Sequence, residues 1–294
     1  MFRLYQASLN LKTLLTYNEM FPDKTLNVLR SFAMLDKENK AILIKHRDKI
    51  DSLILEPGTY TVNMAASKPR TNVNVETYKD FLLRFGDLFD FYFNFDIDFT
   101  DDGFETNLYN QRVLEDAGLS PVPIIHNIYS DETTYYIEQG YDRIALGSPQ
   151  IRSVKDLEHV MSQFEGTKIK VHLLGNTGYD YLTMFPLNSV DSTMWARAGG
   201  FGDIYYWNPK KEGANKTDKI YMEEYLHADA KKLTTFTNYE FQKDLILYLK
   251  QELGITYQDL MGSEGSYFKR LVNIHHYVKL EERVNRIHKQ KGFI

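Results

Sequence analysis

Residues 122–148 read VPIIHNIYSDETTYYIEQGYDRIALGS, and this stretch decides the fold. An apolar run at 122–127 is followed by helix-forming residues that end at Gly140, and a second apolar run follows at 143–148. Short apolar runs bounded by turn residues are typical of buried strands, and a helical segment between two of them is typical of parallel strands. The stretch therefore predicts one strand–helix–strand unit of a parallel sheet.

The same alternation of strand and helix recurs over residues 1–209. The expected helices begin near Ser, Asp or Glu and often end at Gly, as helix capping favours. About eight strands in roughly 210 residues predict an α/β fold of the (β/α)8 TIM-barrel class. An open doubly wound sheet is the alternative, but neither a G-x-G-x-x-G nor a Walker A motif occurs. Further strands are expected at 2–9, 52–56, 90–97, 168–175, 189–195 and 203–207, and helices at 76–87, 109–118, 131–140 and 153–164.

The pattern changes after Pro209. The segment KKEGANKTDK at 210–219 is polar, and two long helices are expected beyond it, at 239–254 and 266–290. We therefore expect a catalytic TIM barrel at 1–209 and, at 210–294, a loop with additional C-terminal helices packed on the barrel.

Composition excludes several classes of protein. The chain has 294 residues, 43% hydrophobic and 26% charged, which is an ordinary globular composition. It has no cysteine, so disulfides and thiolate zinc sites are excluded. The pair His275–His276 has no acidic residue three or four positions further on, so we expect no metal and no cofactor. No signal peptide or run of about 18 apolar residues is present, which predicts a cytoplasmic protein that does not enter membranes.

The charge is unevenly distributed. A net charge of −5 does not favour nucleic acid, but the chain from Lys269 onward is basic. Arg197 and this basic helix are the candidates for contacts with backbone phosphates, and the alternative is a solvated helix face. The candidate residues are Arg197, Lys269, Arg270 and Arg283.

Polar residues end nearly every predicted strand. In a barrel the active site lies where the carboxyl ends of the strands meet. The plain alternative is that loops begin there. Acidic side chains from three strands would nevertheless converge, and their pKa values would be spread apart by burial and repulsion. That is the setting for a nucleophile beside a general acid or base. The residues are Glu56, Asp96, His126, Gly147, Ser148, Gly175 and Asp191, with Tyr60 placed to stack on a ligand.

Several of these segments resemble the tRNA-guanine transglycosylase family. LEPGTYT at 55–61 resembles the family's D-S-G-G-F/Y-Q, and the run at 173–195 resembles the segment that holds the nucleophilic Asp. FNFDID at 93–98, IIHN at 124–127 and IALGS at 144–148 resemble its base-binding segments in the right order. The similarity covers roughly residues 1–209 and is greatest to the short, phage-type relatives that are similar to enzymes inserting 7-deazaguanine bases into DNA.

The resemblance implies a role for each matching residue. Asp191 falls on the nucleophile and Glu56 on the general base. Asp96 and His126 fall on positions that bind the base, where His replaces the family's Gln. Gly147, Ser148, Gly175 and Tyr60 would line the base. The family's zinc site of three Cys and one His cannot form, and no C-terminal RNA-binding domain is apparent.

The implied reaction exchanges guanine in nucleic acid for a free 7-deazapurine base through a covalent intermediate between Asp191 and C1′. DNA is favoured over tRNA because the zinc and RNA-binding elements are missing. A phage-encoded enzyme would act in the host cytoplasm, and whether the barrel forms a homodimer is open. Two other functions compete: a retaining glycoside or N-nucleoside hydrolase that uses Glu56 and Asp191, and an inactive barrel that binds nucleic acid.

Overall fold

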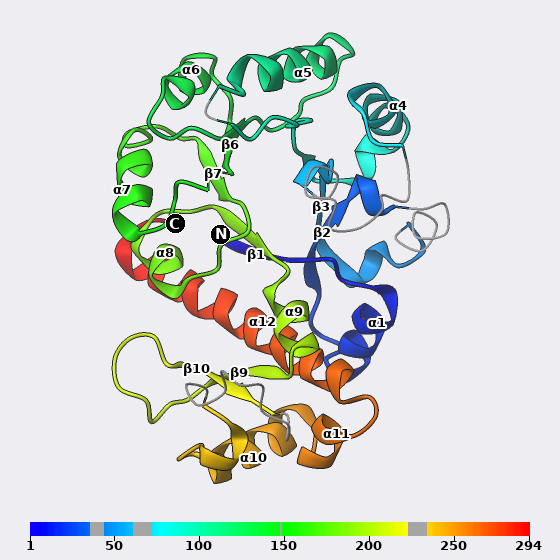
Figure 1. Ribbon diagram of the computed structural model, residues 1–294, viewed down its shortest axis with the longest axis vertical. Coiled ribbons are helices and arrows are strands. Elements are labelled where there is room, and N and C mark those ends of the chain that lie inside the picture. The colour runs from blue at the N-terminus through cyan, green and yellow to red at the C-terminus, as the bar shows by residue number, and fades with distance from the viewer. Residues whose placement is uncertain (36–43, 61–71, 101, 148, 223–233) are drawn as a thin grey trace. The chain divides into compact units, whose positions relative to one another are not determined.

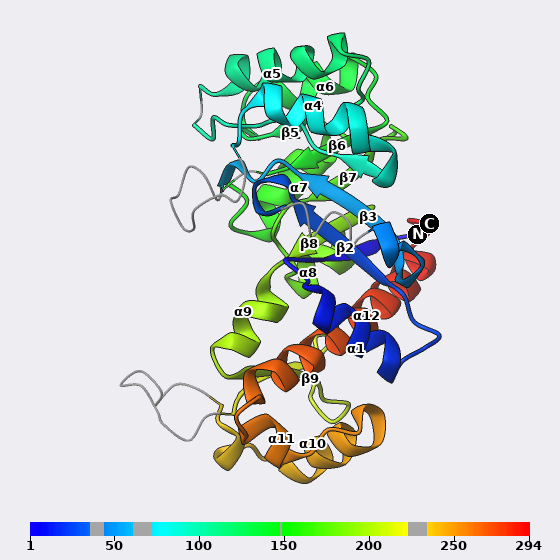
Figure 2. The ribbon, with the colours of Figure 1, turned by 90° about the vertical axis from the view of Figure 1, so that its right-hand side faces the viewer.

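Eight parallel strands form one sheet at the centre of the larger part of the protein. The computed structural model describes residues 1–35, 44–60, 72–100, 102–147, 149–222 and 234–294. The strand order is β4-β3-β2-β1-β8-β7-β6-β5, so each strand lies beside its neighbours in sequence, and β1 lies beside β8. Figures 1 and 2 show these strands with helices α4 to α8 around them. The strands are β1 Arg3–Ala7, β2 Leu26–Ser31, β3 Ile50–Glu56, β4 Phe91–Tyr92, β5 Ile124–Ile125, β6 Arg143–Leu146, β7 Lys170–Leu173 and β8 Ser189–Ser192.

The two outer strands of that order are joined, which closes the sheet. A parallel bridge pairs Phe93, just after β4, with Val122, just before β5. The amide of Asn94 donates to the carbonyl of Val122 at 2.9 Å, and the amide of Val122 donates to the carbonyl of Tyr92 at 2.8 Å. All neighbouring strands are therefore parallel around a closed ring, which is the (β/α)8 barrel that the sequence predicts.

In the described part of the barrel unit, helices α4 to α8 follow successive strands from β3 to β7, and their starts reflect local sequence. Asn74 caps α4 and Ser153 caps α7, each through a capping box in which the side chain accepts from the third helical amide. The helices are α4 Val75–Phe85, α5 Phe104–Asp116, α6 Glu132–Glu138, α7 Val154–Ser162 and α8 Tyr179–Met184.

The barrel interior is filled by every second residue of the strands. Tyr5, Leu29, Ile54, Phe93 and Ala145 belong to one buried cluster that draws on most of the strands. Side chains alternate between the two faces of a strand, so residues two positions apart share a face. The residue two places after an interior residue therefore also faces inward, nearer the carboxyl end of the barrel.

The fold class is confirmed, but one strand prediction is wrong and one barrel strand was not predicted. Residues 203–207 form β9, Asp203–Trp207, which pairs antiparallel with β10, Thr217–Tyr221, and not with the barrel. The eighth barrel strand is instead β2, whose sequence LNVLRS contains an Asn, an Arg and a Ser that obscure the apolar run. The expected helices at 76–87, 109–118, 131–140 and 153–164 are present as α4 to α7.

The chain divides into two compact units, and the division differs from the expected boundary at residue 209. The first unit comprises 1–9, 25–192 and 287–294, and the second comprises 10–24 and 193–286. The barrel thus ends with β8. Within the second unit, Asn273 donates to the carbonyls of Trp195 and Asp203, both at 3.1 Å, and so ties three segments together. Its elements include α1 Leu11–Met20, α9 Met194–Gly200, α10 Gln242–Tyr248, α11 Tyr257–Met261 and most of α12 Gly265–Lys291.

Among the described residues, no helix combines the length and the apolar character needed to cross a bilayer.

We expect Gly58→Ala to destabilise the barrel more than Gly118→Ala does. The two glycines have φ values of 82° and 81°, so both variants pay the strain of a left-handed backbone. A Cβ on Gly58 would lie 2.2 Å from the Ser31 hydroxyl oxygen and 2.6 Å from the Ala33 Cβ, whereas a Cβ on Gly118 meets nothing within 4 Å. Overpacking should lower the free energy of unfolding of Gly58→Ala by about 1–3 kcal/mol more than that of Gly118→Ala. Urea unfolding of both variants measures this difference, and equal losses would show that the Gly58 site relaxes.

Candidate active site

The alternation of the strands brings four of the predicted site residues to the carboxyl end of the barrel. Glu56 lies two residues after Ile54 on β3, and Asp191 lies two residues after Ser189 on β8. His126 and Gly147 likewise follow interior residues of β5 and β6 by two positions. The side chains of Glu56, His126 and Asp191 therefore face inward at the same end of the barrel, where Gly147 also lies.

Asp191 is held through one of its two carboxylate oxygens. Its Oδ1 accepts from the amide of Gly175 at 3.0 Å and pairs with Nε2 of His172 at 3.3 Å. Gly175 supplies its amide from a left-handed backbone with a φ of 68°, a conformation that glycine adopts without strain. Within the described part of the chain, no group donates to Oδ2 of Asp191. Asp191 as a whole is 7% exposed, so the carboxylate is nearly buried, fixed at Oδ1 and without a described donor at Oδ2.

Glu56 has a strongly perturbed acidity. Desolvation, together with the negative charges of Asp191 and Asp96, raises its pKa to about 8, and the nearby Ser31 hydroxyl opposes this rise. A carboxyl group with that pKa keeps its proton at neutral pH. The charges of Asp191 and Asp96 thus act on Glu56 across the end of the barrel.

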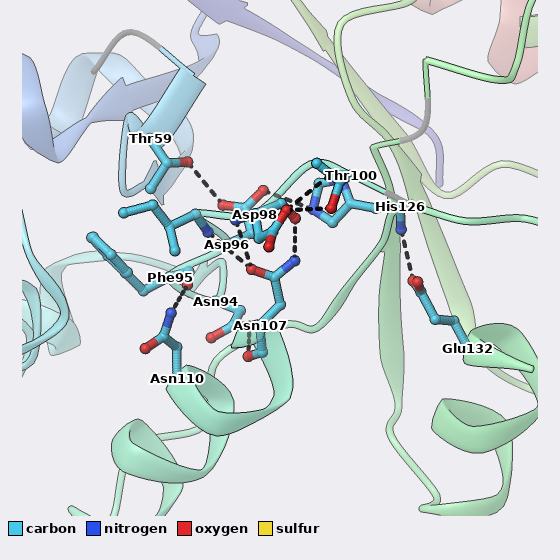
Figure 3. A network of polar contacts seen from close by, with 11 residues as sticks. Thr59, Asn94, Phe95, Asp96, Asp98, Thr100, Asn107, Asn110, His126 and Glu132 are labelled. Atoms are coloured by element: carbon cyan, nitrogen blue, oxygen red, sulfur yellow. Dashed lines mark hydrogen bonds and ion pairs between the residues drawn. The ribbon is translucent and has the colours of Figure 1, made fainter. Parts of the chain in front are cut away.

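Asp96 uses both of its oxygens within the protein. Oδ1 accepts from the Thr59 hydroxyl at 3.1 Å, and Oδ2 pairs with Nε2 of His126 at 3.1 Å (Figure 3). A carboxylate accepts only, so Nε2 of His126 carries the proton. The amide of His126 donates to Oε2 of the buried Glu132 at 2.8 Å, which fixes the backbone from which the ring extends.

Two asparagines of α5 fix the loop that carries Asp96. The side-chain Oδ1 of Asn107 accepts from the amides of Ile97 and Asp98, at 3.0 and 3.1 Å, and its Nδ2 donates to the backbone carbonyl of Asp98 at 2.6 Å. Asn110 donates to the carbonyl of Phe95 at 2.9 Å (Figure 3). The sequence does not distinguish these two residues from other polar residues of a helix, and only their contacts identify them.

Aromatic rings lie beside the Asp96–His126 pair. The Phe99 ring is 5.2 Å from the His126 ring and 6.3 Å from the Tyr60 ring. Tyr60 is 64% exposed, so its ring is accessible to a ligand. Phe99 was not among the predicted site residues, although it follows the strand end directly.

Gly147 is tightly enclosed. A Cβ there would lie 2.8 Å from a methyl carbon of Ile124 and 3.4 Å from Cε1 of His126. Only a glycine lets β6 approach its neighbours so closely. Ser148, the other predicted residue of this segment, lies outside the described residues.

The four predicted phosphate contacts all belong to the second unit, and one of them is wrong. Lys269 is 2% exposed, and a buried ammonium group cannot reach a nucleic-acid backbone. Arg270 donates to the carbonyl of Ala196 at 3.3 Å, and Arg283 lies 4.2 Å from the Trp207 ring centre. Arg197 is exposed on α9. The basic composition of α12 therefore reflects packing within that unit as well as a solvated face.

The histidine pair on α12 is also used structurally. Nδ1 of His275 lies 3.2 Å from the Tyr17 hydroxyl, and the Phe21 ring stacks on the His275 ring at 4.6 Å. His276 packs against Tyr205 at 5.6 Å. Burial lowers the pKa of His275 to about 4 and that of His276 to about 3. The described residues contain no group of three or more His, Asp or Glu side chains able to hold a metal ion.

Comparisons with known proteins show no family for this chain. No protein-family model matches the chain, and no curated protein matches it. Among solved structures, the chain is similar to a chain of "a cube-shaped, highly porous protein cage designed by fusing symmetric oligomeric domains", with 12% identity and a TM-score of 0.41. The alignment covers 65% of this chain and 62% of that chain. A second similar structure is described as "Native KDPGal structure", with 13% identity, a TM-score of 0.40, and 65% of this chain and 81% of that chain covered.

Glu56→Gln is expected to change how stability depends on pH. The folded-state pKa of about 8 lies above the ordinary value of 4.5. The wild-type protein therefore has the full contribution of the neutral carboxyl below pH 4.5 and loses it as pH rises through about 8. The amide variant has no proton to lose, so from pH 5 to pH 9 it should gain stability relative to wild type, on the order of 1 kcal/mol or more.

Urea unfolding at several pH values measures this gain, with Glu138→Gln on the exposed end of α6 as the control. A pH dependence that is the same for both variants would contradict the raised pKa of Glu56.

Proposed function

We propose that this protein is a base-exchange transglycosylase that replaces guanine in a nucleic acid with a free 7-deazaguanine derivative. The observation that carries the proposal is the state of Asp191, whose Oδ1 is held by Gly175 and His172 while Oδ2 has no donor among the described residues. A carboxylate fixed in this way is suited to attack an electrophilic carbon through its open oxygen. The resemblance of the strand-end segments to the tRNA-guanine transglycosylases supports the same role.

The first half of the reaction needs a nucleophile and an acid. Oδ2 of Asp191 attacks C1′ of the target nucleotide, and the bond between C1′ and N9 of guanine breaks. The proton of Glu56 passes to the departing base, because a group whose pKa is about 8 is protonated at neutral pH. The products are a covalent ester between Asp191 and C1′, free guanine and an ionised Glu56.

The second half reverses the roles. The ionised Glu56 takes the proton from N9 of the incoming 7-deazaguanine, N9 attacks C1′, and Asp191 is released. Two displacements retain the configuration at C1′. Glu56 therefore acts as an acid and then as a base, and no proton is gained or lost over the whole cycle.

Base recognition is assigned to the side of the site formed by β4 and β5. Asp96 and His126 supply polar groups for the purine edge, and Tyr60 and Phe99 supply rings beside them. To reach C1′ and exchange the whole base, the enzyme has to act on an extruded or single-stranded nucleotide. DNA remains our expected acceptor, on the resemblance to the phage-type relatives.

A retaining hydrolase is the second candidate, because the pairing of an open carboxylate with a protonated Glu56 fits it equally well. In that reaction water takes the place of the incoming base. The two are separated by their products, since hydrolysis leaves an abasic site while exchange leaves the polymer intact.

Asp191→Asn should abolish exchange and leave the fold intact, because the amide is a poor nucleophile of nearly the same shape. The measurement is the retention of radiolabelled guanine in duplex DNA, single-stranded DNA and bulk tRNA. Asp116→Asn, at the exposed end of α5, is the matched control and should exchange at the wild-type rate. Exchange by a well-folded Asp191→Asn variant at near wild-type rate would remove Asp191 from the mechanism.

The rate of covalent-complex formation should be constant below pH 8 and fall as pH rises above it, because the first displacement needs the proton of Glu56, whose pKa is about 8. Trapping the complex by denaturation at short times, with wild type and Glu56→Gln, measures this profile. A rate that instead rises through pH 8 would show that the first displacement needs an ionised base.

A further inference from the structure

His172 is a completely buried polar residue that the sequence did not single out. It lies on β7, directly beside Ser189 of β8 in the parallel register, and its side chain is 0% exposed. Asp191 follows Ser189 by two positions and therefore faces the same side of β8. The three side chains consequently form one row inside the barrel.

The hydrogen bonds of this row fix the tautomer of His172. Nδ1 lies 2.8 Å from the Ser189 hydroxyl oxygen, and Nε2 lies 3.3 Å from Oδ1 of Asp191. A carboxylate can only accept, so Nε2 has to carry the proton, and Nδ1 then accepts from the Ser189 hydroxyl. The neutral ring has one donor and one acceptor, so the contact of Nε2 with Asp191 and the contact of Nδ1 with Ser189 require the same tautomer.

The residues around the His172 ring favour its neutral form and restrict its rotation. The rings of Phe93, Tyr5 and Phe91 lie 5.0, 6.1 and 6.2 Å from the His172 ring. Burial lowers the pKa of His172, and the contact with Asp191 opposes that effect while the charge of Arg143 adds to it. These aromatic neighbours leave the imidazole little freedom to rotate.

We infer that His172 is a positioning residue that, through its Nε2 proton and with its tautomer set by Ser189, holds Asp191 so that Oδ2 points toward the reacting carbon. Gly175 alone would leave the carboxyl group free to rotate about a single hydrogen bond at Oδ1. The amide of Gly175 and Nε2 of His172 both donate to Oδ1, so the carboxyl group cannot rotate freely. Neither donor occupies Oδ2. The inference rests on the proposed function for its consequence in catalysis, but the contact itself can be tested without activity.

Nitrogen-15 spectra of the protein with labelled histidine test the contact. We expect a protonated Nε2 and an unprotonated Nδ1 for His172, assigned by the signals that His172→Phe lacks. Asp191→Asn keeps an acceptor oxygen and should leave these signals near their wild-type positions, whereas Asp191→Ala removes the acceptor and should shift them. A ring protonated at Nδ1, or signals that Asp191→Ala leaves unchanged, would overturn the inference.

Guanine exchange tests the catalytic consequence. His172→Phe keeps the ring and loses the donor, so kcat should fall about 100-fold with KM unchanged. His172→Gln restores an N–H donor and should recover part of that loss. Ser189→Ala keeps the imidazole and frees its tautomer, so it should also lower kcat, and it serves if the Phe variant does not fold. His159→Phe on the exposed face of α7 is the control.

The two measurements separate the possible failures. Wild-type kcat in folded His172→Phe and Ser189→Ala would overturn the positioning role. A loss that His172→Gln does not relieve in any degree would also overturn it, because the donor would then not be what matters. If the wild-type protein exchanges no base in any acceptor, the proposed function fails, and the spectra still decide whether His172 holds Asp191.

Discussion

The closure of the sheet between β4 and β5 is the constraint on which the site depends. The hydrogen bonds between the backbones of Tyr92, Asn94 and Val122 join the two outer strands of the order, so the carboxyl ends of all eight strands lie on one ring. Without that closure, Asp96 after β4 and His126 after β5 would lie at opposite edges of an open sheet. With it, they are hydrogen-bonded to each other.

The three acids at the strand ends differ because the protein groups around them stabilise a negative charge to different degrees. Asp191 receives two N–H donors and Asp96 receives a hydroxyl and an imidazole, so each has protein groups that stabilise its negative charge. For Glu56, desolvation and the charges of Asp191 and Asp96 outweigh the effect of the Ser31 hydroxyl, and its pKa rises to about 8. The same chemical group thus provides a negative charge at one strand end and a proton at another, because the surrounding donors are unequally distributed.

The sequence predicts the barrel because seven of its strands are apolar runs with turn residues at their ends. It fails at β2, whose polar Asn27 and Arg30 break the run, and at 203–207, whose apolar residues are typical of a buried strand in either unit. The acids at the strand ends follow from periodicity. His172 does not, because a histidine within an apolar run has no local signal that distinguishes a hydrogen-bonding partner of Asp191 from a core residue. The burial of Lys269 could not be predicted either, because the sequence around it is that of a basic helix.

The chain passes between its two units four times, after residues 9, 24, 192 and 286, so neither unit is a single stretch of sequence. The final passage brings the end of α12 into the barrel unit, where His288 contacts the carbonyl of Leu182 at 2.7 Å and packs beside Phe2. A protein that is synthesised from its N-terminus cannot make these contacts until residue 288 has left the ribosome. The barrel unit therefore cannot be completed during translation until every residue of the second unit has been made.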